Sequence, residues 1–340
     1  MSPLLRALFA FGGPAGCETR RAVALCRPPG NRPAGRARTM DRFNIGHVTV
    51  HRIEEWQGTF APPSYLFQGY TPEGWDPHAE EFAPEYFDPA TGHLYAFLQS
   101  WVLDTGKERI LFDTGAGNDK DRPNIPIFSN LQTDFLGNLA RAGFQPEDID
   151  VVVCSHIHID HVGWNTRLVE GKWEPTFRNA RYVLPLADRA YWDPEDGAAG
   201  PEGVGAAVNA GMYEDSVAPI VAAGRAEWAE PGFAVADGLT LHACPGHTPG
   251  SMMLEVMGKD DNALFVGDVV HHPAQIYRPE WNSVFCEEPE QARETRRMVL
   301  ELAASREALL VPAHFGGNHA ARVLREGTGF RPVLGALGLG

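Results

Sequence analysis

The sequence predicts a single α/β domain in which helices cover packed β-sheets. Three observations support this fold class. Short strand patterns alternate with helical patterns along most of the chain, which is typical of mixed α/β domains. With 340 residues, 44% of them hydrophobic and 10% aromatic, the chain can bury a large core. There is no internal repeat and no clear linker after Met40, so we expect one domain over residues 40–340.

The first predicted strand is residues 47–53, which alternate apolar and polar side chains. Residues 94–104 and 108–115 form a predicted hairpin. Between these strands, residues 56–92 are rich in proline and aromatic side chains. A connection of this length inside a compact domain is usually functional or disordered, and so many large rings argue against disorder. We therefore expect an ordered segment that can lie over a functional site.

The remaining elements alternate between helices and strands. Apolar residues recur at helical spacing in the predicted helices, and proline stands in the first turn of the last of them. Residues 180–192 are expected to form a strand and then a helix. The other helices are expected at residues 128–143, 213–224 and 288–305, and the other strands at residues 149–154, 239–244, 251–257, 262–268 and 308–316.

Residues 1–39 have a different composition, rich in arginine, proline and glycine and almost without acidic side chains. Such a segment cannot bury enough apolar surface to fold. We therefore expect a disordered or spurious N-terminal extension before a natural start at Met40. An organelle transit peptide and a secretory signal are the alternatives, and the signal is the weaker because Arg6 interrupts its apolar run.

Charge and cysteine content exclude several partner classes. The chain has a net charge of -15 although its first 40 residues are basic, so the remaining domain is strongly acidic and nucleic-acid binding is disfavoured. The five cysteines have no paired spacing, which predicts a reducing, cytoplasmic setting without disulfides or a thiolate zinc site. No apolar run approaches the roughly 18 residues of a membrane span. A small-molecule substrate fits these limits, and a homodimer is possible if part of the aromatic segment is exposed.

The stretch Cys154–Asn165, CSHIHIDHVGWN, holds three histidines and an aspartate directly after a predicted strand. Imidazoles this close would repel one another if charged and would need partners if buried. A metal ion solves both problems. Further strand ends supply two more histidines and an aspartate, and nitrogen and oxygen donors without thiolate suit zinc, iron or manganese. The candidate ligands are His156, His158, Asp160, His161, His247, Asp268 and His314.

These residues lie in five separated motifs, FDTG, SHIHIDH, PGHTPGS, VGD and PAHF. With them, roughly residues 45–325 resemble the metallo-β-lactamase fold superfamily of metallohydrolases. The resemblance implies an αββα four-layer sandwich and two divalent metal ions, with zinc expected first. It also implies that Asp113 supports the ligand loop from a neighbouring strand. In this pattern His156, His158 and His247 hold the first metal, Asp160, His161 and His314 hold the second, and Asp268 bridges both.

The resemblance also implies a mechanism, in which metal ions activate a water molecule and Asp160 shuttles a proton. The chain is most similar to the lactonase and organophosphate-hydrolase branch. We therefore expect a lactone or ester substrate, such as an N-acyl homoserine lactone. Trp164, Tyr191 and His271 are the predicted substrate contacts.

The same superfamily resemblance is also compatible with other functions. One is a mononuclear-iron dioxygenase of the persulfide dioxygenase type, which uses the first metal position alone. Another is a β-lactam or organophosphate hydrolase, and a third is a non-catalytic binding protein on this fold. The number of metal ions separates the first of these from a dinuclear hydrolase.

Overall fold

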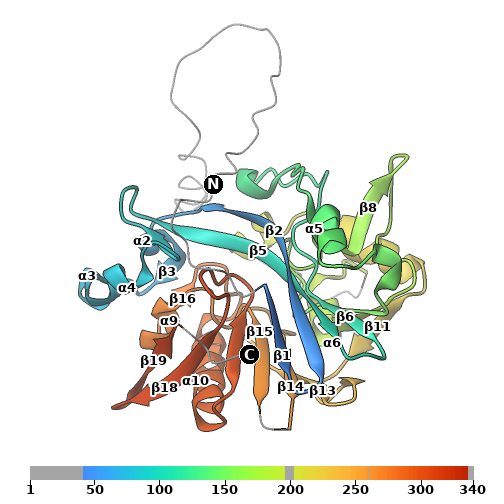
Figure 1. The fold of residues 1–340 in the computed structure, drawn as a ribbon. Coiled ribbons are helices and arrows are strands. Elements are labelled where there is room, and N and C mark those ends of the chain that lie inside the picture. The colour runs from blue at the N-terminus through green and yellow to red at the C-terminus, as the bar shows by residue number, and fades with distance from the viewer. Residues whose placement is uncertain (1–40, 196–202, 260, 336–340) are drawn as a thin grey trace, which may run out of the picture.

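The computed structural model describes residues 41–195, 203–259 and 261–335. Two mixed β-sheets pack face to face, and helices cover the outer face of each (Figure 1). The predicted αββα sandwich is confirmed. The predicted extension over residues 1–39 lies outside the described residues, and its separation from a domain over residues 40–340 stays a prediction.

The first sheet has the strand order β1-β2-β5-β6-β7-β10-β11, with β4 beside β5. Neighbours from β6 to β11 are parallel, and the others are antiparallel. The strands are β1 (Arg42–Ile45), β2 (Val48–Thr59), β4 (Phe87–Asp88), β5 (His93–Asp104), β6 (Arg109–Phe112), β7 (Val151–Val153), β10 (Arg181–Pro185) and β11 (Ala226–Ala229).

The second sheet has the strand order β12-β13-β14-β15-β17-β18-β19, and only β15 and β17 are parallel neighbours. Two small ribbons pair β3 with β16 and β8 with β9. The strands are β12 (Ala234–Ala236), β13 (Leu239–Ala243), β14 (Met252–Met257), β15 (Asn262–Gly267), β17 (Leu309–Pro312), β18 (Ala321–Glu326), β19 (Gly329–Val333), β3 (Phe67–Gln68), β16 (Asn282–Ser283), β8 (Thr166–Val169) and β9 (Lys172–Pro175).

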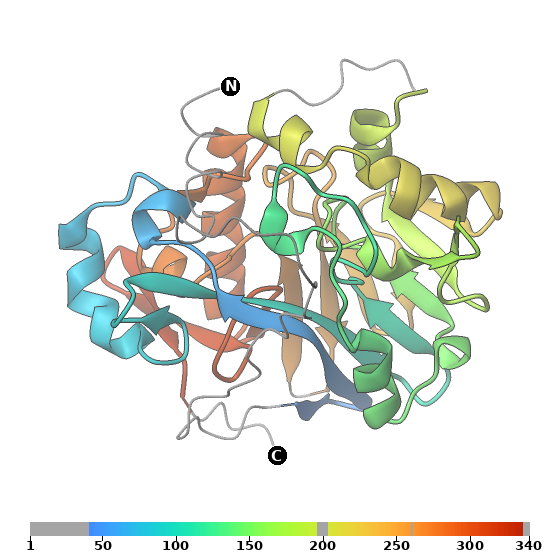
Figure 2. The same ribbon diagram turned by 90° about the horizontal axis from the view of Figure 1, so that it is seen from above.

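The helices lie on two opposite sides of the sandwich (Figure 2). None that the structure describes combines the length and apolar character needed to cross a bilayer. On the first sheet lie α5 (Phe135–Arg141), α6 (Leu186–Trp192), α7 (Gly203–Val208) and α8 (Ala218–Ala222), and on the second lie α2 (Pro63–Leu66), α3 (Pro72–Trp75), α4 (Ala79–Phe82), α9 (Ala274–Tyr277) and α10 (Pro289–Ser305). Single helical turns cover Asp76–His78, Pro126–Phe128, Pro146–Asp148, Gly163–Asn165 and Tyr213–Val217.

Side-chain alternation along the strands builds the layers. In β5, Trp101 and Leu103 pack in the core between the sheets, whereas Val102 packs outward under the helices. This period of two is what an extended chain imposes. Both faces of β5 are buried, so most of its side chains are apolar on both faces, with the buried Gln99 and Ser100 as exceptions.

Most predicted elements are confirmed with shifted ends, including the hairpin of β5 and β6 and the long helix α10. The helix predicted over residues 128–143 is wrong in its first half, because only Phe135–Arg141 is helical. Asn130 has a φ of 50°, and its amide donates to the Lys120 carbonyl at 2.6 Å. These contacts to a neighbouring loop replace the hydrogen bonds that a helix would make.

The aromatic segment over residues 56–92 is ordered, as expected, and contains short helices rather than a plain loop. Its first part lies at the functional site, where Phe60 and Leu66 line a cavity. Its second part packs under the outer face of the second sheet, with Trp75 and Phe82 against the ring of His272. Only the first part of this segment therefore lies over the functional site.

Candidate metal centre

The predicted ligands lie in loops at one edge of the two sheets. Parallel pairing of β6 with β7, and of β15 with β17, brings the carboxyl ends of these strands together. In parallel sheets this edge is where ligands commonly bind. The loop after β7 carries His156, His158, Asp160 and His161, the turn between β13 and β14 carries His247, and Asp268 and His314 follow β15 and β17.

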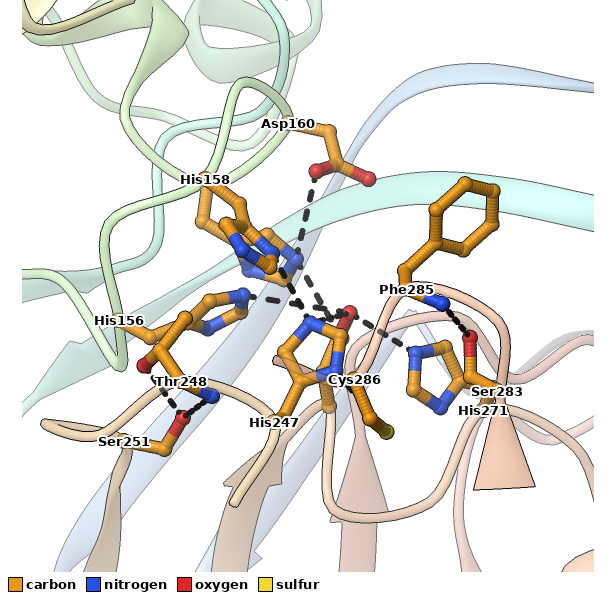
Figure 3. A network of polar contacts seen from close by, with 12 residues as sticks. His156, His158, Asp160, His247, Thr248, Ser251, His271, Ser283, Phe285 and Cys286 are labelled. Carbon is orange, nitrogen blue, oxygen red and sulfur yellow. Dashed lines mark hydrogen bonds and ion pairs between the residues drawn. The ribbon is translucent and has the colours of Figure 1, made fainter. Parts of the chain in front are cut away.

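The rings of His156, His158 and His247 lie close together (Figure 3). Asp268 lies beside them, between two pairs of histidines. Its Oδ2 lies 3.2 Å from His247 Nε2 and 4.0 Å from His156 Nε2. Its Oδ1 lies 3.1 Å from the Nε2 atom of His314 and 3.3 Å from that of His161. The two oxygens thus face different pairs of histidines, as in a carboxylate that bridges two ions.

Within the described residues, the candidate ligand atoms form overlapping groups of three in which all atoms lie within 4.8 Å of one another. One group corresponds to the predicted first metal position and one to the second. Imidazole and carboxylate donors this close suit a divalent cation. The groups are His156 with His158 and His247, Asp160 with His161 and His314, His156 with His161 and Asp268, and His247 with Asp268 and His271.

Four of the five ligand histidines have a polar partner at the ring nitrogen that points away from the cluster. His161 Nδ1 lies 3.0 Å from Asp113 Oδ2, and His314 Nδ1 lies 2.8 Å from the Phe97 carbonyl oxygen. Because these acceptors hold the Nδ1 proton, Nε2 of both rings, which faces Asp268, is the nitrogen that is left for a metal. The other partners are Ser155 Oγ for His156 Nδ1 at 3.0 Å and Cys286 Sγ for His247 Nδ1 at 3.6 Å.

Asp113 connects the end of β6 to the ligand loop. Its Oδ1 accepts from Ser155 N at 2.7 Å, and its Oδ2 accepts from Ser155 Oγ at 2.9 Å as well as from His161. The residue has a φ of 57°, a left-handed conformation that aspartate tolerates. These contacts support the role predicted for Asp113.

Asp188, on α6, ties two ligand loops together. Its Oδ2 accepts from Ile157 N at 2.8 Å and from Thr248 Oγ1 at 2.9 Å, and its Oδ1 accepts from Gly250 N at 2.6 Å. Burial outweighs these hydrogen bonds and raises the pKa of Asp188 to about 6. The sequence gave no signal for this role, because an aspartate in a short helix far from the motifs is ordinary.

The donor set fits a metal ion. Among the described residues, Nε2 of His156, Nε2 of His161 and Oδ1 of Asp268 are buried and have no hydrogen-bond partner. Unpaired buried polar atoms are costly, and cations at the two predicted positions would satisfy all three. Burial also lowers the pKa of His156 and His247 well below the usual value, so both rings are neutral and able to bind a metal.

A cavity that is open to solvent lies against the cluster. His158, Asp160, His247, Asp268, His271 and His314 form its polar end. No lysine or arginine that the structure describes lines it. Its walls are mainly apolar and include Phe60, Leu66, Leu94, Ile125, Phe128 and Phe285.

The three predicted substrate contacts lie in different places. His271 lines the cavity, with Nε2 at 3.2 Å from Asp268 Oδ2. Trp164 does not line it, since its ring is buried against Phe135 and its Nε1 donates to Glu55 Oε1 at 2.7 Å. Tyr191 does not line it either. Of the three, only His271 is therefore placed to touch a substrate.

Glu55 is another buried carboxylate that the sequence did not single out. It accepts from Ala116 N at 2.7 Å, Gly117 N at 3.0 Å and the Trp164 indole, and so fixes the loop after β6. Gly163 lies against the same loop, and a Cβ there would meet the Ala116 carbonyl carbon at 2.0 Å. The Gly163-Trp164 pair therefore serves close packing behind the ligand loop.

A family model described as the metallo-beta-lactamase superfamily matches residues 97–314. The chain belongs to this superfamily. It is therefore an enzyme of the metallo-β-lactamase superfamily of hydrolases. Ribonuclease TTHA0252 of Thermus thermophilus is 26% identical to it over 180 residues, which cover 49% of this chain but only 34% of the ribonuclease.

Several solved structures of superfamily hydrolases share the fold. The hydrolase AbOPH is 24% identical, with a TM-score of 0.72 over 86% of this chain and 96% of that chain. AidC, a dizinc quorum-quenching lactonase solved with an N-hexanoyl-L-homoserine product, is 18% identical, with a TM-score of 0.70 over 87% and 97%. A probable metal-dependent hydrolase of Staphylococcus aureus is 17% identical, with a TM-score of 0.66 over 86% and 98%. At these identities the similarity shows a shared fold.

Proposed function

We propose that this protein is a dinuclear metal-dependent hydrolase that opens a lactone or carboxylic ester bond, with zinc as the expected metal. The observation that carries the proposal is an apolar cavity lined at one end by five of the seven predicted ligands, with the other two, His156 and His161, grouped with them. A cavity with this apolar lining and polar end suits a small molecule with an acyl chain or a ring. The lactonase AidC, which shares the fold, adds support from a related protein.

The seven predicted ligands would hold two cations, with Asp268 between them. When bound, such a pair of cations supplies an activated water molecule and an electrophile for the carbonyl oxygen of the substrate. The protein supplies position, because the ring partners of four of the five histidines fix which nitrogen faces the cluster. The apolar walls exclude water from the remainder of the substrate.

Asp160 is the residue best placed to move a proton. It is the most exposed of the seven predicted ligands, at 17% of its side chain, and it lines the cavity. Its Oδ2 lies 3.6 Å from His314 Nε2. A carboxylate at the boundary between ligands and substrate can take a proton from water and pass it to the leaving oxygen.

His271 can assist by binding the substrate. Its Nδ1 is buried without a hydrogen-bond partner among the described residues, its Nε2 lies 3.2 Å from Asp268 Oδ2, and the ring lines the cavity. An imidazole there can donate to the oxygen on which negative charge develops.

The structure favours this function over two alternatives. The absence of lysine and arginine from the cavity lining, at least within the described ranges, disfavours a phosphate backbone as substrate. This observation argues against the activity named for the ribonuclease relative. A persulfide dioxygenase would use the first position alone, whereas Asp160, His161 and His314 form a second complete group.

The test is a panel of acyl homoserine lactones, aryl esters, phosphotriesters, β-lactams and acylglutathiones, assayed with protein of known metal content. We expect two metal ions per chain and the highest kcat/KM on a neutral lactone or ester with an apolar acyl group. One iron per chain with oxidation of a persulfide would contradict the proposal. If a phosphotriester or a β-lactam is turned over fastest, the proposed metal centre is supported and the proposed substrate class is contradicted.

The cellular setting follows from the cysteines. Cys154, Cys244 and Cys286 are all buried and unpaired, which supports a reducing compartment such as the cytoplasm. The proposed partner is a small-molecule substrate. A homodimer stays a prediction, which size-exclusion chromatography with light scattering would test.

A further inference from the structure

Glu287 is a buried carboxylate that no step above uses. Its side chain is 6% exposed, and its Oε1 has no hydrogen-bond partner among the described residues. The atom lies 3.7 Å from His158 Nε2, which is also buried and also lacks a partner. Two costly unpaired atoms thus face each other across a gap slightly longer than a hydrogen bond.

The surroundings hold Glu287 in this place. Its backbone amide donates to the His247 carbonyl oxygen at 2.9 Å, which ties it to a second predicted ligand. Gly205 of α7 lies so close that a Cβ there would meet Glu287 Oε1 at 1.6 Å. The carboxylate therefore has little freedom to turn away from His158.

Tyr191 orients the other carboxylate oxygen. Its hydroxyl donates to Glu287 Oε2 at 3.0 Å. Burial, followed by the nearby charge of Glu287, raises the pKa of Tyr191, so the hydroxyl stays protonated and remains a donor. With Oε2 held by Tyr191, Oε1 is the atom that is left for the imidazole.

We propose that Glu287 and Tyr191 are positioning residues for the first metal ion, acting through His158. Glu287 accepts the Nε2 proton of His158, which leaves the Nδ1 lone pair to face the metal, and Tyr191 holds Glu287 in place. His158 Nδ1 already lies 3.0 Å from His247 Nε2, on the side of the cluster. The inference rests on the proposed metal centre and adds two residues that control it.

In this arrangement, one histidine at each metal position has a carboxylate partner. At the second position, Asp113 is the partner of His161. At the first, Glu287 is the partner of His158, while His156 and His247 face a hydroxyl and a thiol (Figure 3, for Cys286 beside His247). A carboxylate partner raises the basicity of an imidazole ligand, and losing one typically weakens metal binding about 10- to 100-fold.

The experiment compares metal binding in Glu287→Gln, Tyr191→Phe and the control Glu288→Gln, whose side chain is exposed one residue away. Metal-stripped protein is titrated with Zn²⁺ against a chromophoric chelator, and the Co²⁺ form is examined by visible absorption. We expect Glu287→Gln to weaken one of two binding steps by about tenfold or more and to shift the Co²⁺ bands. The other step should change less than threefold.

Tyr191→Phe leaves the Glu287 carboxylate in place. It therefore tests the inference even if Glu287→Gln does not fold correctly. We expect it to weaken the same step by a smaller factor and to leave the other step unchanged. The inference is overturned if both steps in Glu287→Gln match those in Glu288→Gln. It is also overturned if both steps weaken equally, since that would indicate a general structural loss. The readout is metal affinity, so failure to hydrolyse any ester would bear on the proposed substrate alone.

Discussion

Asp113→Asn removes one negative charge and replaces one acceptor with a donor at the second metal position. Asparagine tolerates the φ of 57° found at this residue, so the backbone can stay as it is. The amide oxygen can still accept from Ser155 N. The amide NH₂ then faces His161 Nδ1, where the native residue has an acceptor at 3.0 Å.

This reversal changes which nitrogen of His161 carries the proton. With a donor against Nδ1, the neutral ring places its proton on Nε2, the atom that faces Asp268 at 3.3 Å. A protonated Nε2 cannot bind a metal. The same NH₂ faces Ser155 Oγ, which can then donate to His156 Nδ1 and affect the first position as well.

We expect Asp113→Asn to weaken the second metal by about 10- to 100-fold, which is about 1.4–2.7 kcal/mol. The assay is metal content after dialysis against graded chelator, with circular dichroism to confirm folding. Asp119→Asn is the matched control, because Asp119 also has a positive φ, of 63°, but accepts from the exposed Gln132. Two metals bound at native affinity in Asp113→Asn would refute the tautomer argument.

Four further predictions follow from the site and its supports. His158→Ala should abolish turnover and lower metal content by elemental analysis; full activity would contradict the ligand assignment. Ala96→Phe should fill part of the cavity, so KM should rise for long-chain esters and not for acetyl esters, and an equal rise for both would contradict the acyl-pocket assignment. Gly267→Ala should lower the free energy of unfolding by about 1–3 kcal/mol in urea, because Gly267 has a φ of 50° and a Cβ would meet Ser155 Oγ at 2.7 Å; no loss would be inconsistent with this packing. Burial raises the pKa of Glu55 from 4.5 to about 7, so folded chains hold a proton that unfolded chains lose. The unfolding free energy of metal-free protein, relative to Glu55→Gln, should therefore fall between about pH 4.5 and 7 by up to about 3 kcal/mol, and a pH-independent difference would contradict this.

The sequence predicted the sandwich, most of its strands and the seven candidate ligands, because these depend on local patterns. A strand that ends in H-x-H-x-D-H carries its own chemical signal, and the later histidines and aspartate follow strands of the same kind. The structure places Asp268 between two histidine pairs, and its predicted role as a bridging ligand stays a prediction. Whether metal ions occupy these positions is the prediction that the experiments address.

The supporting residues could not be predicted, because their roles depend on tertiary contacts. Glu287 lies 129 positions after its partner His158 in the chain, and Asp188 binds loops from both halves of the fold. Trp164 stands three residues after His161, yet the turn directs its ring into the core. The helix expected from residue 128 failed for the same reason, since contacts with another loop outweigh a local apolar pattern.

The most direct test of the account is a Zn²⁺ titration of metal-stripped, folded protein, with bound metal and ester hydrolysis measured in the same samples. We predict that hydrolysis appears only with bound metal and reaches its maximum at two ions per chain. Folded protein that binds no metal, or that hydrolyses the substrate at full rate without it, would contradict the central claim.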